Sequence, residues 1–360
     1  MTLHRRDVAA GAPWERPLHG TLDRLVVESE LLAGNPLGDP AHRPLWVYRP
    51  PGVEPDHPRP LPSVYVIQGY TGQLDMWANR VAFEPTFLER LDHLFASGGC
   101  ADAIVVLVDA WTSFGGSQFL DSTSTGPYLS YLCDEVVPFV DAHYPTAAHR
   151  DHRGLTGKSS GGYGAMVVPM LRPDVFGALA THAGDALFEA CYLPEFPARA
   201  RQLRDEFDGS WDTFFERAQN ADPPKWEWIL LLELYGYAAA YSPDPANPGR
   251  ALIPFDVNGR LIAHIWAQWV EKDPVRMAPR HADALRSMRR IHIESGNKDE
   301  YFLDLGAQAF AAELTKLGVQ HTCQLFDGTH ARLTYRYPGA IRELVTALEP
   351  GDARPAGSRR

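Results

Sequence analysis

The sequence contains no apolar run long enough to cross a membrane, and residues 1–20 lack the apolar segment that a secretory signal needs. Basic residues are also few, since 34 Lys and Arg stand against 45 Asp and Glu, for a formal net charge of −11. No long basic run offers a surface for phosphate groups, so nucleic acid is not an expected partner. We expect a soluble cytoplasmic protein that binds neither membranes nor nucleic acid; the sequence leaves a homo-oligomer open.

Cysteine is scarce as well. The four cysteines are far apart, with no C-x-x-C pair and no Cys/His cluster at zinc-binding spacing: Cys100, Cys133, Cys191 and Cys323. This pattern predicts buried thiols in a reducing compartment, and we expect no metal or other cofactor. The chain does have length and apolar content, because 360 residues with 45 % hydrophobic side chains can bury a large core.

Short apolar runs alternate with helical patterns along most of the chain. The expected strands cover 22–28, 45–48, 64–67, 104–108, 154–156, 178–181, 291–294 and 321–326. The expected helices cover 86–96, 128–142, 162–171, 303–317 and 338–348. This alternation predicts an α/β protein with a mostly parallel central sheet that is covered by helices on both faces. The first two strands have no helix between them, so we expect the sheet to start antiparallel.

One connection is far longer than a crossover requires. Residues 186–288 separate two expected strands and contain helical patterns at 200–218, 226–240 and 261–270. Because a crossover needs only one helix, we predict a helical insertion that serves as a lid, with its tryptophans mainly forming a small core of its own. The other expected parts are an N-terminal extension at 1–20, a core at 21–185 and 289–350, and a disordered tail at 351–360.

A G-x-S-x-G pattern at 157–161 directly follows an expected strand and precedes a helical pattern. This is the context of a nucleophile elbow, a strained turn that presents a serine. Ser159 has glycine two residues before and two residues after it, whereas Ser160 has Lys158 two residues before it. Ser159 is therefore the predicted nucleophile; a simple glycine-rich connection is the alternative.

A serine nucleophile needs a base, and the base needs an acid that orients it. Asp299 follows the strand expected at 291–294, and His330 follows the strand expected at 321–326. Both residues should lie at the edge of the sheet where parallel strands end and ligands bind, and their order after Ser159 fits a hydrolase triad. Glu300 and Asp304 compete for the role of the acid, and Asp299 has a helix N-cap as its alternative role.

The intermediate of such a reaction needs two backbone N–H donors. We expect one from Ser160, the residue after the nucleophile, and the other from Tyr70, because Gly69 permits a close approach of the backbone; a plain glycine turn is the alternative. The side chains predicted to contact the substrate lie near the ends of neighbouring strands: Gln68, Trp111, Phe119 and Asp185.

Several segments together carry a family resemblance. They are Tyr131–Phe139 (YLCDEVVPF), 157–165 (GKSSGGYGA), Gly296–Asp299 (GNKD) and Gly328–His330 (GTH). In these segments the chain resembles the putative-esterase family, which includes esterase D (S-formylglutathione hydrolase), enterochelin esterase-like hydrolases and the antigen 85 mycolyltransferases. The resemblance implies an α/β-hydrolase fold and a metal-free serine mechanism with Ser159, Asp299 and His330 as the triad.

The chain departs from that family at three places. Ser160 stands where many members carry Met, Gln68 stands where many carry His or Asp, and the tryptophan-rich insertion lies outside the family core. These differences leave the mechanism intact but do not allow a substrate to be transferred. The leading hypothesis is a hydrolase of small or medium carboxylic esters; an acyltransferase with the same acyl-enzyme, and a non-catalytic binding protein on this scaffold, are the alternatives.

Overall fold

The computed structural model describes residues 16–221 and 225–349, so most of the expected N-terminal extension and the expected tail at 351–360 lie outside the described residues. All eight expected strands are present, with their ends moved by a few residues. They are β1 (Thr21–Glu28), β2 (His42–Arg49), β3 (Ser63–Ile67), β4 (Ile104–Val108), β7 (Arg153–Ser159), β8 (Ala178–Gly184), β9 (Arg290–Gly296) and β10 (Thr322–Phe326).

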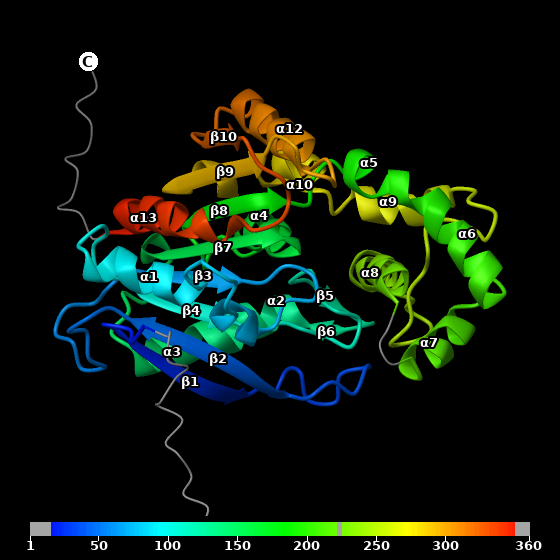
Figure 1. Cartoon of the computed structure of the whole chain (residues 1–360). Coiled ribbons are helices and arrows are strands. Elements are labelled where there is room, and N and C mark those ends of the chain that lie inside the picture. Colours follow the sequence, from blue (N-terminus) through cyan, green and yellow to red (C-terminus); the bar gives the residue numbers. More distant parts are fainter. Residues whose placement is uncertain (1–15, 222–224, 350–360) are drawn as a thin grey trace, which may run out of the picture.

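These strands form a single twisted sheet in the order β1-β2-β4-β3-β7-β8-β9-β10 (Figure 1). β1 pairs with β2, and β2 with β4, in antiparallel fashion, whereas every later pair is parallel. The expected antiparallel start is thus confirmed. A two-stranded hairpin, β5 (Asp121–Ser122) and β6 (Gly126–Pro127), lies apart from the sheet.

Helices cover both faces of the sheet because its central strands are apolar on both sides. All residues of β3 and β4 are buried, and their side chains alternate between the two core layers. The covering helices are α1 (Phe87–Ala96) and α13 (Tyr337–Leu348) on one face, and α2 (Tyr128–Ser130), α3 (Val137–His143), α4 (Ser160–Leu171) and α12 (Leu303–Lys316) on the other. The expected α/β architecture is confirmed.

The helix expected at 128–142 contains a wider turn. A π-helical segment, Tyr131–Val136, joins α2 to α3, and Pro138 lies in the first turn of α3. Proline has no backbone N–H and its ring collides with the carbonyl one turn earlier, so the wider π turn accommodates it. Three short 3₁₀ segments complete the core: η1 (Leu74–Ala78), η3 (Arg150–His152) and η6 (Leu333–Tyr335).

The insertion between β8 and β9 extends from one side of the sheet (Figure 1). Its elements are α5 (Phe188–Cys191), η4 (Leu193–Glu195), α6 (Phe196–Phe207), α7 (Trp211–Gln219), α8 (Trp226–Tyr241), α9 (Ala263–Val270), α10 (Pro274–Met277), η5 (Ala278–His281) and α11 (Ala282–Arg286). α10 and α11 pack against α12 and α4, respectively. This last part of the predicted insertion therefore covers the sheet as a crossover helix would, and the excess chain ends near α9.

The single helix expected at 200–218 is wrong, because the structure contains two helices there. Asp208 and Gly209 have φ angles of +57° and +71°, in the left-handed region that ends a helix. Ser210 then starts α7, accepting a hydrogen bond from the Thr213 N–H at 3.2 Å. The break between the two helices depends on the backbone angles of Asp208 and Gly209, which the spacing of apolar residues does not predict.

The insertion's tryptophans mostly pack within it. Trp269 is fully buried in the large core cluster, and Trp211 and Trp228 pack against a smaller cluster around Phe207. Trp226 differs, because it is 62 % exposed and lines the cavity described below.

Candidate active site

The predicted nucleophile lies at the end of β7, and α4 begins at the next residue. Ser159 has φ +58° and ψ −127°, a conformation that costs a non-glycine residue about 1–3 kcal/mol. A side chain at Gly157 would lie 2.5 Å from the Gly161 carbonyl carbon, and one at Gly161 would lie 2.6 Å from the Gln68 oxygen. Both glycines are therefore required for the tight turn that presents Ser159.

Sheet register brings the other two predicted residues to the same edge. Gly296 of β9 pairs with Phe326 of β10, so the loops that follow these strands leave the sheet together. His330 Nε2 lies 3.1 Å from Ser159 Oγ, and His330 Nδ1 lies 2.8 Å from Asp299 Oδ2. This chain of contacts has the geometry of a Ser-His-Asp triad.

Asp299 is held in place by its own loop. Its Oδ1 accepts a hydrogen bond from the Tyr301 N–H at 2.9 Å, and its side chain is buried. The competing acid Glu300 instead accepts from the backbone N–H of His330 at 2.9 Å, which lowers the pKa of Glu300, and Asp304 lies in the first turn of α12. The imidazole therefore has Asp299 as its partner, while Glu300 holds the loop that carries His330.

The loop after β3 lies directly against the nucleophile. A side chain at Gly69 would lie 3.0 Å from the Lys158 carbonyl oxygen and 3.3 Å from Ser159 Cβ, so glycine favours this close approach. Tyr70 follows in this loop, and Ser160 is the first residue of α4, whose N–H groups have no partner within the helix. Among residues 16–221 and 225–349, no protein acceptor is bonded to either N–H. The role of these two N–H groups as oxyanion donors stays a prediction.

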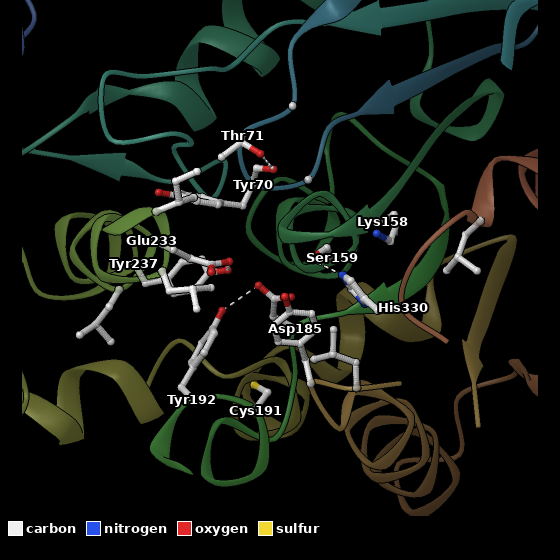
Figure 2. Close-up of a pocket in the computed structure, with 18 of the residues that line it drawn as sticks. Tyr70, Thr71, Lys158, Ser159, Asp185, Cys191, Tyr192, Glu233, Tyr237 and His330 are labelled. Atoms are coloured by element: carbon white, nitrogen blue, oxygen red, sulfur yellow. Dashed lines mark hydrogen bonds between the residues drawn. The ribbon is translucent and has the colours of Figure 1, made fainter. Parts of the chain in front are cut away.

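A cavity of about 580 Å³ opens over Ser159 and His330 (Figure 2). The sheet edge contributes one wall, with the loops that carry Gly69, Ser159 and His330. The insertion contributes the opposite wall, chiefly from the segment between Cys191 and Arg199 and from α8. The volume is in the range of small-molecule sites.

The four side chains predicted to contact the substrate occupy different places. Asp185 lines the cavity, whereas Gln68, Trp111 and Phe119 line a separate crevice of about 10 Å³, which is too small for a substrate group. Gln68 is buried, and its amide can donate to the Val108 carbonyl at 3.1 Å. These three residues therefore support the cavity from behind, because their strand-end positions face inward.

Other cavity residues were not predicted from the sequence. Tyr192, Glu233 and Tyr237 come from the insertion wall, and Lys158 and Tyr301 lie beside the triad. The Tyr301 ring packs edge-on against the imidazole of His330, with centroids 4.9 Å apart. One signal was available, since Glu233 is a lone acid within the otherwise uncharged run 228–241.

Burial changes the ionisation of three of the cavity's charged groups. It raises the pKa of Asp185 above its ordinary value, and it raises the pKa of Glu233 to about 7. It also lowers the pKa of Lys158, although Asp299 and Asp185 oppose that change. The site thus holds acids that take up protons more readily than usual.

Among residues 16–221 and 225–349, no three His, Cys, Asp or Glu side chains are grouped so that they could hold a metal ion. Within the same ranges, no helix has the length and apolarity needed to cross a membrane.

Comparison with protein families gives one match over most of the chain. The family model described as "Putative esterase" matches residues 41–338. A curated relative, the endo-1,4-beta-xylanase/feruloyl esterase of Xylanibacter ruminicola, is 27 % identical over 105 residues. That match spans 29 % of this chain and 14 % of the relative's length, so it concerns a small part of the relative.

Solved structures show the same fold at low sequence identity. A ferulic acid esterase has a TM-score of 0.57 at 18 % identity, covering 92 % of this chain and 100 % of that chain. An S-formylglutathione hydrolase from Agrobacterium tumefaciens has a TM-score of 0.56 at 16 % identity, covering 93 % of this chain and 98 % of that chain. At such identities the likeness concerns the fold alone.

Proposed function

Because this chain belongs to the putative-esterase family and is an esterase, we propose that it hydrolyses small or medium carboxylic esters through an acyl-enzyme on Ser159. The observation that carries the proposal is the continuous contact chain from Asp299 through His330 to Ser159, which ends in the cavity.

In the first step, Ser159 Oγ attacks the ester carbonyl carbon while His330 Nε2 accepts the hydroxyl proton. The carbonyl oxygen becomes an oxyanion, which the N–H groups of Tyr70 and Ser160 stabilise. The bond to the alcohol then breaks, and His330 gives its proton to the departing alkoxide. The products are the free alcohol and an acyl group bound to Ser159.

In the second step, water replaces the alcohol. His330 accepts a proton from the water as its oxygen attacks the acyl carbon, and the same oxyanion donors serve again. The bond to Ser159 Oγ breaks, His330 returns the proton to this oxygen, and the carboxylic acid leaves. Asp299 keeps the imidazole in the orientation and tautomer that both steps need.

Labelling with a fluorophosphonate probe tests this assignment. The probe should form a covalent adduct on Ser159, and Ser159→Ala should abolish both the label and the hydrolysis of p-nitrophenyl acetate. Label on another residue, or esterase activity that survives in Ser159→Ala, would overturn the proposed nucleophile. Adding alcohols as acceptors then measures how much acyl group goes to water and how much to alcohol.

A further inference from the structure

Two carboxylic acids line the cavity between Ser159 and the insertion. Asp185 follows β8 and is 3 % exposed, and Glu233 lies on α8. Figure 2 shows both side chains projecting into the same part of the cavity, from opposite elements. We call Asp185 and Glu233 the acid pair.

Each acid has a hydrogen-bond donor on only one of its two oxygens. Tyr192 donates to Asp185 Oδ2 at 2.7 Å, and weaker contacts from Gln118 and Ser160 reach this same oxygen. The Tyr237 hydroxyl donates to Glu233 Oε1 at 2.6 Å. Within the ranges 16–221 and 225–349, no protein donor reaches Asp185 Oδ1 or Glu233 Oε2, so each acid keeps one free acceptor.

The acid pair also differs from its charged neighbours. Glu195 pairs with Arg199 at 3.4 Å, and Arg332 pairs with Glu84, whereas neither member of the acid pair forms an ion pair with any described residue. A buried carboxylate without a cation is costly, and two nearby carboxylates raise one another's pKa. The acid pair therefore has no direct ion-pair partner among the described residues, although Lys158 and Arg199 also line the cavity.

A protonated amine has the chemistry that these acids lack. It carries a positive charge and up to three N–H donors, enough to serve both unpartnered oxygens, whereas a hydroxyl offers a single donor and no charge. The rings of Tyr70, Tyr192 and Tyr237 pack together at this wall, with centroids 4.7 Å (Tyr192–Tyr237) and 5.7 Å (Tyr70–Tyr237) apart. Aromatic faces add attraction for a cation.

The direction of catalysis assigns the amine to one part of the substrate. His330 must protonate the departing alcohol, so the alcohol leaves on the His330 side of Ser159. Glu233 and Tyr237 lie on the other side of Ser159 in Figure 2. Resting on the proposed esterase mechanism, we propose that the acyl group of the preferred substrate carries a protonated amine, which the acid pair binds.

Three matched esters test this proposal. They are methyl 3-arylpropanoates with an aminomethyl, a hydroxymethyl or an ethyl group at the para position of the ring, which keeps the amine from attacking its own ester. The wild-type kcat/KM for the aminomethyl ester should exceed that for the ethyl ester by about 10- to 100-fold, as for hydrogen bonds to charged groups. Glu233→Gln should lower this ratio severalfold, because Asp185 alone then binds the amine, whereas Glu227→Gln, an exposed acid on the same helix, should leave it unchanged.

The pH dependence of that ratio is a second readout on the wild-type enzyme. Burial raises the pKa of Glu233 to about 7, while the benzylic ammonium of the substrate stays protonated through this range, so the ratio should rise between about pH 6 and pH 8. The need for neutral His330 cancels, because both esters share it. The other ionisable groups that act on Glu233 are Asp185, Glu195, Arg199, Tyr70, Tyr237 and Tyr301.

Two outcomes would overturn the proposal. If kcat/KM is highest for the hydroxymethyl ester, the acid pair binds a neutral donor and not an amine. If kcat/KM is highest for the ethyl ester at every pH, the acid pair does not bind the substrate and only stabilises the cavity wall. Neither result would contradict the proposed esterase function. That function is tested separately, by turnover of the ethyl ester and by the loss of this turnover in Ser159→Ala. If Glu233→Gln does not fold, the wild-type ratio and its pH dependence still decide the question.

Discussion

The two walls of the cavity have different origins. The catalytic wall consists of loops at the ends of β3, β7, β9 and β10, and its residues meet because parallel strands end at one edge. The insertion wall consists of the segment after α5 and one face of α8, and its residues meet because helices pack across the cavity. We expect the reaction to depend on the first wall and the choice of substrate to depend on the second, so the two walls should respond differently to mutation.

The largest effect should come from the nucleophile on the catalytic wall. Ser159→Ala should lower kcat for p-nitrophenyl acetate by about 10⁴- to 10⁶-fold, because no other group forms the acyl-enzyme. Ser160→Ala should keep most of the activity, because its backbone N–H stays in place and its hydroxyl only reaches Asp185 at 3.5 Å. Equal losses in the two variants would contradict the assignment.

The orienting acid should come next. Asp299→Asn should lower kcat by about 10³- to 10⁴-fold, because an amide favours the wrong tautomer of the imidazole. Glu300→Gln is the matched control, since Glu300 contacts only the backbone N–H of His330 and should cost less than about tenfold. Steady-state kinetics on one ester distinguishes them, and a larger loss in Glu300→Gln would exchange the two roles.

Much of the catalytic wall could be predicted from the sequence because it follows local rules. The glycines on both sides of Ser159 indicate the tight turn that presents it. Asp299 and His330 each follow an apolar strand, and these two strands end side by side because they pair in parallel. The insertion wall gave no comparable signal. α8 is apolar around nearly its whole circumference, so its pattern does not tell which side bears Glu233 and Tyr237 toward the cavity.

Position at the end of a strand does not by itself tell whether a side chain faces the cavity. Gln68, Trp111 and Phe119 do follow strands at the correct edge, yet their side chains face a small crevice behind the loop of Tyr70. Inward or outward orientation depends on local φ values, such as the +53° of Phe119, that composition does not encode.

Stability should depend on a buried acid behind the catalytic wall. Glu294 of β9 bonds His182 of β8 at 2.6 Å and Arg336 at 2.6 Å, and thereby joins the sheet to the segment that follows His330. Glu294→Ala should lower the free energy of unfolding by about 3–5 kcal/mol, because it leaves Arg336 without its partner. Denaturant titration measures this loss; a change below about 1 kcal/mol would mean that the network is not needed.

Glu233, the acid of the insertion wall, should make the free energy of unfolding depend on pH. Burial raises the pKa of Glu233 from 4.5 to about 7, so the folded state binds the extra proton between these values and stability falls as pH rises through them. Glu233→Gln should remove this fall and become more stable than the wild type at pH 8, by at most about 3 kcal/mol. Parallel stability curves for both proteins would contradict it.

The smallest effect should come from the apolar part of the insertion wall, where Ile229, Leu230 and Leu234 line the cavity. In a series of p-nitrophenyl esters from acetate to hexanoate, each added methylene should raise kcat/KM about fourfold until the cavity is full, since burying one is worth about 0.8 kcal/mol. Leu230→Ala should flatten this slope and change acetate little. Leu305→Ala, at an exposed position of α12 outside the cavity, should leave the slope intact.

This slope separates the two walls directly. A defect in the catalytic wall lowers the rate for every ester by the same factor, because each of them uses the same bond-breaking step, so the slope stays unchanged. A defect in the insertion wall acts only on substrates long enough to reach it, and so changes the slope. A profile that is flat or falls from acetate onward in the wild type would mean that acyl chains do not contact the insertion, and substrate selection would then rest with the sheet edge alone.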